Sequence, residues 1–319
     1  MNNKKIIVGV SSLVLLLAGC SVGTQETLGT KESSQQKTEQ AKKENSKTKG
    51  DTLNKILGKT NWQGTKVYDK DNNDLTAENA NFIGLAKYDA ETGRYEFFDA
   101  QTGESRGDRG SFFITNDGTK RILISETMNY QAVVGLTELT NKKFTYTRKG
   151  KDKAGNEVDV FVEHIPYNER KLAFTEKEKS LDTTTGKIDT KTAGATILGK
   201  TLWNGTKVLD ESGNDVTEFN KNFISLAKFA ADTNQYEFFN LETGVSRGDF
   251  GYFDVLNHNK IRTHVSIGQN KYGAALELTE LNSKKFTYKR MGKDQADNEI
   301  TVFVEHEPYT GKFNPEFSF

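Results

Sequence analysis

Hydrophobic and polar residues alternate along much of the chain with the two-residue period of a β-strand. In residues 143–150, for example, Phe144 and Tyr146 fall on one face of an extended segment, and Thr145 and Thr147 fall on the other. No long segment carries the apolar period of an amphipathic helix. Short β-rich runs are instead separated by clusters of turn residues, which predicts an antiparallel β-protein.

This pattern predicts eight strands in the first half of the folded chain. The expected strands are 63–68, 82–88, 94–99, 109–115, 119–126, 131–139, 143–150 and 157–164. A short helix is expected within 70–81, beginning at Thr76. Eight antiparallel strands with short connections favour a barrel or a sandwich, and a closed barrel is preferred because it leaves no exposed strand edge.

The same pattern returns in the second half of the chain. The run ILGKTNWQGTKV at residues 56–67 reappears as ILGKTLWNGTKV at 197–208, and VFVEH at 160–164 reappears at 302–306. Each unit is too long for a solenoid repeat and suits a complete small domain. We therefore expect an all-β protein with two tandem antiparallel eight-stranded barrels, at 52–172 and 193–319, joined by a polar linker at 173–192.

The N-terminus has the layout of a secretory signal. Lys4 and Lys5 precede an apolar run to Leu17, which is shorter than the roughly 20 residues of a membrane-spanning helix. The sequence Leu-Ala-Gly-Cys at 17–20 resembles the bacterial lipobox. That resemblance implies removal of a signal peptide at 1–19 and diacylglyceryl lipidation, with palmitate-type chains, of Cys20. The alternative is an ordinary signal peptide followed by an unrelated cysteine.

Cys20 is the only cysteine, so no disulfide explains it. Residues 20–51 are rich in Gln, Lys, Glu, Ser and Thr, which predicts a disordered stalk behind the lipid anchor. Lipobox, stalk and absence of disulfides together resemble a lipoprotein of a Gram-positive bacterium. We therefore expect the protein on the extracellular face of the cell membrane, with the lipid bilayer as its partner. The 44 basic and 44 acidic residues give no basic field for nucleic acid.

A tryptophan in the first strand, the run of hairpins and the pattern GESRGDRGSFFITNDGTKRILIS resemble the lipocalin-like (calycin) barrels. The whole chain also resembles an uncharacterised two-repeat lipoprotein family of Gram-positive cocci, to which no activity is assigned. The pattern departs from that of calycins in two places. Gly58 lies four residues before Trp62 instead of two, and the candidates for the last-strand arginine, Arg148 and Arg290, fall in the seventh expected strand of their copies.

Barrels of this size either enclose a ligand or are filled by side chains. The candidate residues for a ligand cavity are Trp62, Phe97, Tyr146 and Arg148 in the first copy, and Trp203, Phe238, Tyr288 and Arg290 in the second. The alternative is that these side chains only fill a core.

The tripeptide Arg-Gly-Asp occurs once in each copy, as Arg106, Gly107 and Asp108, and as Arg247, Gly248 and Asp249. It resembles the integrin-binding motif of adhesive proteins, which needs an exposed loop tip. However, the flanking glycines and a strand phenylalanine are repeated with it. We therefore favour a structural turn, in which Gly107 takes a positive φ or forms a bulge, Asp108 accepts backbone N–H groups, and Arg106 binds a carbonyl or a carboxylate.

No catalytic motif is found, so we expect neither enzymatic activity nor a cofactor. His164 and His306 follow Glu163 and Glu305, but neighbouring strand residues point to opposite faces and form no dyad. The acid-rich turns at 70–74 and 210–215 lack the spacing of a calcium loop, so no metal site is expected.

The leading hypothesis for the function is the binding of a small apolar ligand, or of another surface molecule, through the two barrels. The alternatives are a host-cell adhesin acting through the paired Arg-Gly-Asp motifs, and the precursor of a peptide pheromone released from residues 11–19 of the signal peptide.

Overall fold

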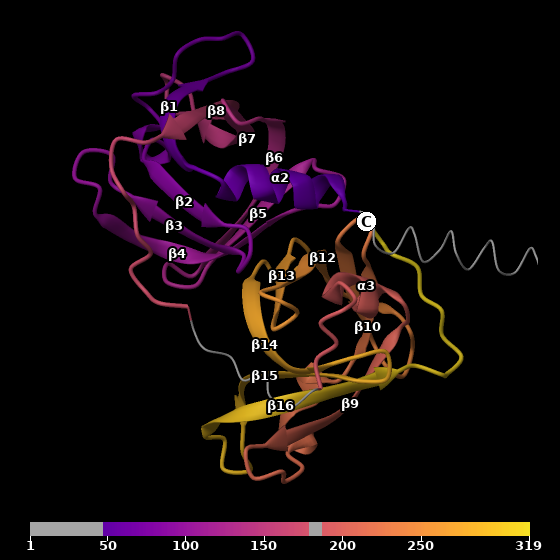
Figure 1. The fold of residues 1–319 in the computed structure, drawn as a ribbon. Coiled ribbons are helices and arrows are strands. Elements are labelled where there is room, and N and C mark those ends of the chain that lie inside the picture. Colours follow the sequence, from indigo (N-terminus) through magenta and orange to yellow (C-terminus); the bar gives the residue numbers. More distant parts are fainter. Residues whose placement is uncertain (1–46, 179–186) are drawn as a thin grey trace, which may run out of the picture. The chain divides into compact units, whose positions relative to one another are not determined.

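The computed structural model describes residues 47–178 and 187–319 of the chain. Two closed antiparallel β-barrels of eight strands each follow one another in this part of the sequence (Figure 1). The predicted fold class is thereby confirmed. The signal peptide, the pheromone-like segment 11–19, Cys20 and the stalk up to residue 46 lie outside the described residues.

In the first barrel every strand pairs with its neighbours in sequence, and the last strand returns to pair with the first. The strands are β1 (Asn61–Tyr68), β2 (Leu85–Asp89), β3 (Arg94–Phe98), β4 (Ser105–Ile114), β5 (Lys120–Ser125), β6 (Tyr130–Leu139), β7 (Phe144–Lys151) and β8 (Glu157–Tyr167). All eight expected strands are present. The largest difference is in β4, which begins four residues earlier than predicted, so that it contains the whole Arg-Gly-Asp motif.

The second barrel repeats this order, and β16 closes it against β9. Its strands are β9 (Trp203–Asp210), β10 (Leu226–Ala230), β11 (Gln235–Phe239), β12 (Ser246–Leu256), β13 (Ile261–Ser266), β14 (Gly273–Leu281), β15 (Phe286–Lys293) and β16 (Glu299–Pro308). Since both copies close in the same way, equivalent residues can be compared position by position.

A helix that the sequence pattern did not predict precedes each barrel, namely α2 (Lys49–Gly58) and α3 (Gly194–Gly199). Helix α2 begins with a capping box, in which the Thr48 hydroxyl accepts from the Asp51 N–H and the Asp51 carboxylate accepts from the Thr48 N–H. Residues 49–51, which we assigned to the stalk, therefore form the first turn of a helix.

Both helices are fixed to the first strand of their barrel through a tryptophan. The indole N–H of Trp62 donates to the Leu57 carbonyl at 2.8 Å, and that of Trp203 donates to the Leu198 carbonyl at the same distance. These four side chains are fully buried. The helices are therefore parts of the two cores.

The helix expected in residues 70–81 is not present in the form predicted. The segment runs through turns and ends in a single 3₁₀ turn, η1 (Ala80–Phe82), whereas the second copy has a longer one, η2 (Thr217–Phe223). The Thr76 hydroxyl accepts from the Val67 N–H at 2.9 Å, and the Asp69 carboxylate accepts two backbone N–H groups of the turn. Such side-chain bonds to the backbone compete with helix formation.

The segment after β8 packs on the outer face of the first barrel, where Leu172 joins Leu85, Phe98 and Tyr167 in a small apolar cluster.

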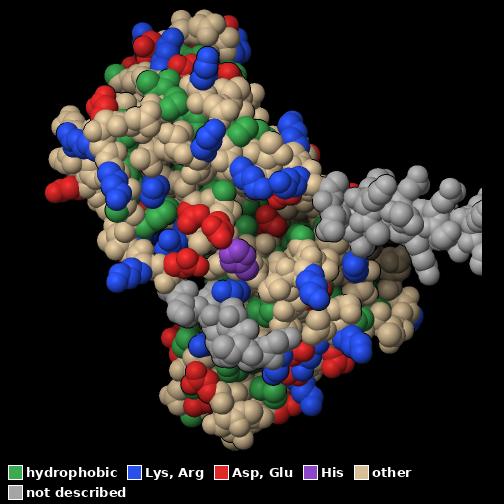
Figure 2. Space-filling view, viewed as in Figure 1, with side chains coloured by type: hydrophobic (Ala, Val, Ile, Leu, Met, Phe, Trp, Pro, Cys, Tyr) green, Lys and Arg blue, Asp and Glu red, His purple; other side chains and the backbone are tan. Residues whose placement is uncertain are grey.

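In the described ranges, no helix has both the length and the apolar character needed to cross a membrane. On the face shown in Figure 2, acidic and basic side chains are intermixed and do not form one basic patch.

Candidate functional site

The first barrel contains a cavity of about 280 Å³ that is partly open to solvent. This volume is near the lower end of the range for pockets that hold small molecules, roughly 300–1,000 Å³. Its apolar wall includes Phe82, Ala86, Phe97, Leu123 and Ala132, and its polar wall includes Tyr88, Arg106, Asp108, Arg121, Tyr130, Tyr146, Arg148 and His164. The interior of this barrel is therefore partly hollow and has a markedly polar wall.

Three of the four residues that we proposed for this cavity line it, namely Phe97, Tyr146 and Arg148. Trp62 is not among the lining residues. Its ring is fully buried and packs edge-on against Phe144, with 5.7 Å between the ring centroids. Because its N–H is bound to the backbone of helix α2, the indole is part of the core. Trp203 is held in the same way in the second barrel.

Arg148 lies on the seventh strand, as predicted, and it does not contact the first-strand tryptophan as the calycin arginine does. Its guanidinium carbon is 3.9 Å from the centroid of the Phe82 ring. In the second barrel, Arg290 lies 3.8 Å from the Phe223 centroid. The strand count is correct, so this departure is real, and the likeness to calycins is one of architecture.

Arg121 is a further cavity residue that the sequence analysis missed. Arg121 is only 2% exposed, and its guanidinium lies 4.4 Å from the ring centroid of Tyr146 and 5.1 Å from that of Phe144. It donates a hydrogen bond to the Tyr88 hydroxyl. The sequence did contain an indication of this position. Arg121 and Leu123 are two residues apart in β5, so both side chains lie on the face that points into the barrel.

Asp108 is the centre of a hydrogen-bond network at this cavity. Its carboxylate accepts from the Tyr95 hydroxyl at 2.9 Å, from the Ser125 hydroxyl at 2.9 Å and from the Tyr130 hydroxyl at 2.6 Å. Burial, reinforced by the nearby carboxylate, raises the pKa of Tyr95 and of Tyr130 well above the usual value. Both tyrosines are therefore donors at neutral pH, and they hold the aspartate toward the barrel interior.

The Arg-Gly-Asp motif forms a bulge in β4. Gly107 has φ of +75°, and the pairing of β3 with β4 shifts its register at this point. Both terminal nitrogens of Arg106 donate to the Asn81 carbonyl at 3.3 Å. Two parts of the structural role that we favoured agree with this geometry, namely the bulge at Gly107 and the carbonyl partner of Arg106. The prediction was wrong about Asp108, whose donors are side-chain hydroxyls and not backbone N–H groups.

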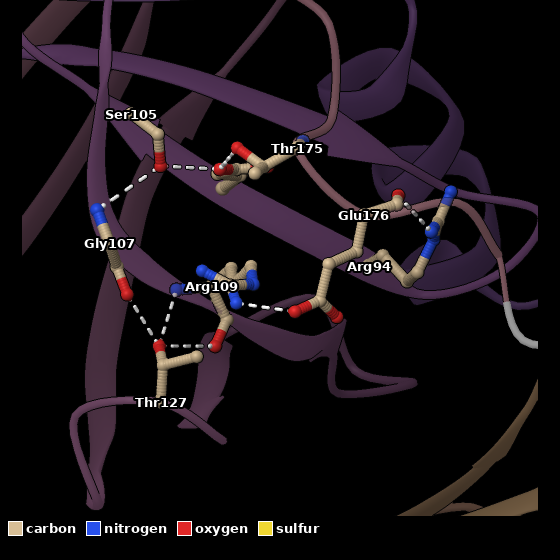
Figure 3. A network of polar contacts seen from close by, with 8 residues as sticks. Arg94, Ser105, Gly107, Arg109, Thr127, Thr175 and Glu176 are labelled. Atoms are coloured by element: carbon tan, nitrogen blue, oxygen red, sulfur yellow. Dashed lines mark hydrogen bonds and ion pairs between the residues drawn. The ribbon is translucent and has the colours of Figure 1, made fainter.

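A buried glutamate, which also binds the serine before the motif, ties the barrel to the segment that follows β8. Glu96 is fully buried and accepts from the Ser105 hydroxyl, from the backbone N–H of Thr175 at 2.8 Å and from the Thr175 hydroxyl. Figure 3 shows Ser105 and Thr175, the two residues that Glu96 connects. Close by, Thr127 donates to the Gly107 carbonyl at 2.6 Å. Thr175 lies in the range that we assigned to the linker, so this end of the linker is bound to the first barrel.

The second barrel preserves both networks except for one donor, since the hydroxyl of Ser266, the counterpart of Ser125, makes no hydrogen bond to Asp249. Asp249 accepts from the Tyr236 hydroxyl at 2.9 Å and from the Tyr272 hydroxyl at 3.0 Å. Fully buried Glu237 accepts from the Ser318 N–H and hydroxyl, both at 2.7 Å. The repetition of the Arg-Gly-Asp motif thus coincides with a repeated internal framework.

The side chains at the positions that line the cavity of the first barrel differ more between the copies. Arg262 takes the place of Arg121, is 2% exposed, and lies 4.4 Å from the Tyr288 ring centroid. Arg290, Phe238 and Tyr288 occupy the positions of Arg148, Phe97 and Tyr146. However, Phe229 replaces Tyr88, and His264 replaces Leu123. The His264 Nε2 lies 3.2 Å from the Tyr272 hydroxyl.

The repeated histidines are packed among aromatic rings. His164 and His306 are buried, and burial lowers the pKa of each to about 3, so both are neutral at physiological pH. The His306 ring stacks on Phe286 with 4.2 Å between centroids. On the opposite face of the strand, Glu163 forms an ion pair with Lys143 at 2.8 Å.

No group of three or more His, Cys, Asp or Glu side chains that could hold a metal ion occurs in the part of the chain that the structure describes. In the acid-rich turns the carboxylates are used locally. Asp69 and Asp210 each accept backbone N–H groups from their own turn. These turns are therefore stabilised by their own aspartates.

A comparison with protein-family models matches residues 54–174 and 195–317 to one family, described as a domain of unknown function (DUF4822). No curated protein matches the chain. The two matched segments coincide with the two barrels, each together with part of its preceding helix and its following segment. The chain therefore belongs to the family of the DUF4822 domain, which it carries twice.

Proposed function

We propose that this protein binds a small molecule with an apolar body inside its first barrel. The observation that carries the proposal is the cavity of about 280 Å³, which is partly open to solvent and walled in part by Phe82, Phe97 and Leu123. A hollow with aromatic side chains and a few polar groups in its wall is typical of small-molecule sites, so it favours a bound molecule. We propose binding without catalysis, since Asp108 is already occupied by three hydroxyl donors.

The proposal includes attachment of the protein to the outer face of the cell membrane through Cys20. It is supported by the signal-like N-terminus and by the resemblance of residues 17–20 to a lipobox. Two acyl chains would give lasting attachment without a membrane-spanning helix. Replacing Cys20 with serine is expected to release the protein from the membrane fraction into the medium. Retention of the Cys20→Ser protein in the membrane fraction would contradict the proposed anchor.

The binding proposal can be tested by filling the cavity. Ala132 lines it, and Ala274 occupies the equivalent position in the second barrel. The wild-type protein is expected to bind members of a panel of small apolar fluorescent probes, and Ala132→Phe is expected to abolish one binding site. Ala274→Phe is the matched control and should keep that site. Failure of the wild-type protein to bind any probe, or unchanged binding by Ala132→Phe, would overturn the proposal.

A further inference from the structure

Three arginines line the cavity of the first barrel. Arg106 is exposed and donates to the Asn81 carbonyl, whereas Arg121 and Arg148 carry guanidinium groups that no carboxylate neutralises. None of the ion pairs formed by the described residues involves Arg121 or Arg148. Asp108, the one carboxylate among the described lining residues, accepts its hydrogen bonds from hydroxyl groups instead. The wall of the cavity therefore has an excess of positive charge.

The hydrogen-bonding capacity of these arginines is also incompletely used. Arg121 donates to the Tyr88 hydroxyl, but its Nε is buried and has no partner among the described residues, and the same is true of the Nε of Arg148. The nearby aromatic rings stabilise the cations in part. Buried charges in proteins are nevertheless usually paired, because an unpaired one loses its hydration without compensation.

The second barrel keeps both arginines although their surroundings have changed. Arg262 is as buried as Arg121, and its Nε likewise has no partner within the described residues. The hydroxyl of Tyr88 is absent there, because Phe229 takes its place. Retention of the arginine without its hydroxyl acceptor indicates that the guanidinium serves something other than that one hydrogen bond.

We infer that the ligand of the first barrel carries an anionic group, a carboxylate or a phosphate, that is bound by Arg121 and Arg148. This inference rests on the proposed function, since it assigns the chemical class of the molecule in the same cavity. A guanidinium offers a planar fork of N–H donors that matches either anion. The apolar part of the ligand lies against Phe97 and Leu123, so the ligand is a small amphipathic anion.

The test compares ligands that differ only in the head group. Decanoate, decanol and decyl phosphate are titrated calorimetrically into the wild-type protein and into Arg121→Met and Arg148→Met, at neutral pH. At the site that Ala132→Phe abolishes, an anion is expected to bind at least about tenfold more tightly than decanol. Arg121→Met should weaken anion binding by about ten- to a hundredfold and leave decanol binding within about twofold.

The outcomes separate the inference from the proposed function. Equal affinity for decanoate, decyl phosphate and decanol would overturn the anionic head group and leave the binding role standing, whereas no binding of any of the three would count against both. The stronger of the two anions identifies the head group. Arg170→Met, which changes an exposed arginine outside the cavity, is the matched control. Near-ultraviolet circular dichroism confirms folding, and Arg148→Met provides a second variant if Arg121→Met does not fold.

Discussion

The hydroxyl of Tyr95 donates a hydrogen bond to Asp108 at 2.9 Å, and the hydroxyl of Tyr236 donates one to Asp249 at the same distance. Both aspartates belong to an Arg-Gly-Asp tripeptide. In each barrel the aspartate joins tyrosines that are not on adjacent strands, and in the first barrel these are Tyr95 on β3 and Tyr130 on β6. The chemistry of the motif is therefore directed toward the barrel interior.

Replacement of Asp108 by alanine is predicted to destabilise the first barrel. Tyr95 and Ser125 would each lose their acceptor, and leaving buried donors unsatisfied costs about 1–3 kcal/mol. We expect the free energy of unfolding, measured by urea denaturation, to fall by roughly this amount. Arg106→Ala is the control, since Arg106 is exposed and its loss should cost less than about 1 kcal/mol. An Asp108→Ala protein as stable as the wild type would contradict the role assigned to this carboxylate.

The same geometry predicts the behaviour of the motif toward cells. If the two motifs are structural, the double variant Arg106→Ala, Arg247→Ala should attach to integrin-bearing cells no differently from the wild-type protein. The measurement is the number of cells retained on surfaces coated with each protein, with an adhesive Arg-Gly-Asp peptide as the positive control. Attachment that occurs with the wild-type protein and is lost in the double variant would instead support the adhesin hypothesis.

Helix α2 is predicted to be essential for the first barrel. Leu57 is fully buried, and its carbonyl accepts the indole N–H of Trp62. Leu57→Ala is expected to lower the free energy of unfolding by about 2–5 kcal/mol, the usual range for a large apolar side chain removed from a core. Thermal and urea unfolding followed by tryptophan fluorescence measure this change. The exposed Lys55→Ala on the same helix should have little effect, and a comparable loss there would show that the helix acts in another way.

Acid is predicted to destabilise both barrels through their buried histidines. Burial lowers the pKa of His164 and His306 from 6.5 to about 3, so the unfolded chain binds protons first as the pH falls. Their contribution to stability is fully present above pH 6.5 and is lost between pH 6.5 and 3, at about 1.4 kcal/mol per pH unit for each histidine. His306→Gln should reduce this slope, and His258→Gln, at an exposed position, should not. A slope that His306→Gln leaves unchanged would refute the assignment.

Alkali is predicted to act through the buried tyrosines. Burial raises the pKa of Tyr88 from 10.0 to about 12, although its hydrogen bond to Arg121 acts in the opposite direction. The stability from Tyr88 is therefore complete below pH 10 and is lost as the pH rises toward 12. Tyr88→Phe should reduce the loss of the free energy of unfolding between pH 10 and pH 12. An absorbance titration of this variant should show one fewer phenol that ionises late. A Tyr88 that ionises with the exposed phenols would contradict its burial.

The strand pattern of the sequence was sufficient to predict the barrels, because alternation such as that of Phe144 and Tyr146 directly reflects the two faces of a strand. The early start of β4 was missed because Gly107 and its polar neighbours read as a turn, and only the pairing with β3 shows them to be a bulge. Helix α2 was missed because a short helix in a polar segment is stabilised by tertiary contacts of residues such as Leu57, which local sequence does not reveal.

The polar wall of the cavity was harder to predict than its aromatic residues. Phe97 and Tyr146 were identified since aromatic side chains are expected inside a barrel. Arg121 was not, because a charged residue in a strand is ordinarily placed in solvent. The sequence shows that Arg121 lies on the same face of its strand as Leu123. Its burial, however, depends on closure of the barrel and on the aromatic rings around it.

The exchange of Leu123 for His264 has a consequence for the evolution of this protein. The networks around Asp108 and Asp249 are shared by the two copies, whereas the side chains facing the two interiors have diverged. A duplicated domain that keeps its framework and alters its lining is free to acquire a specificity of its own, while its twin retains the ancestral one. One polypeptide can in this way hold two barrel interiors of different chemistry.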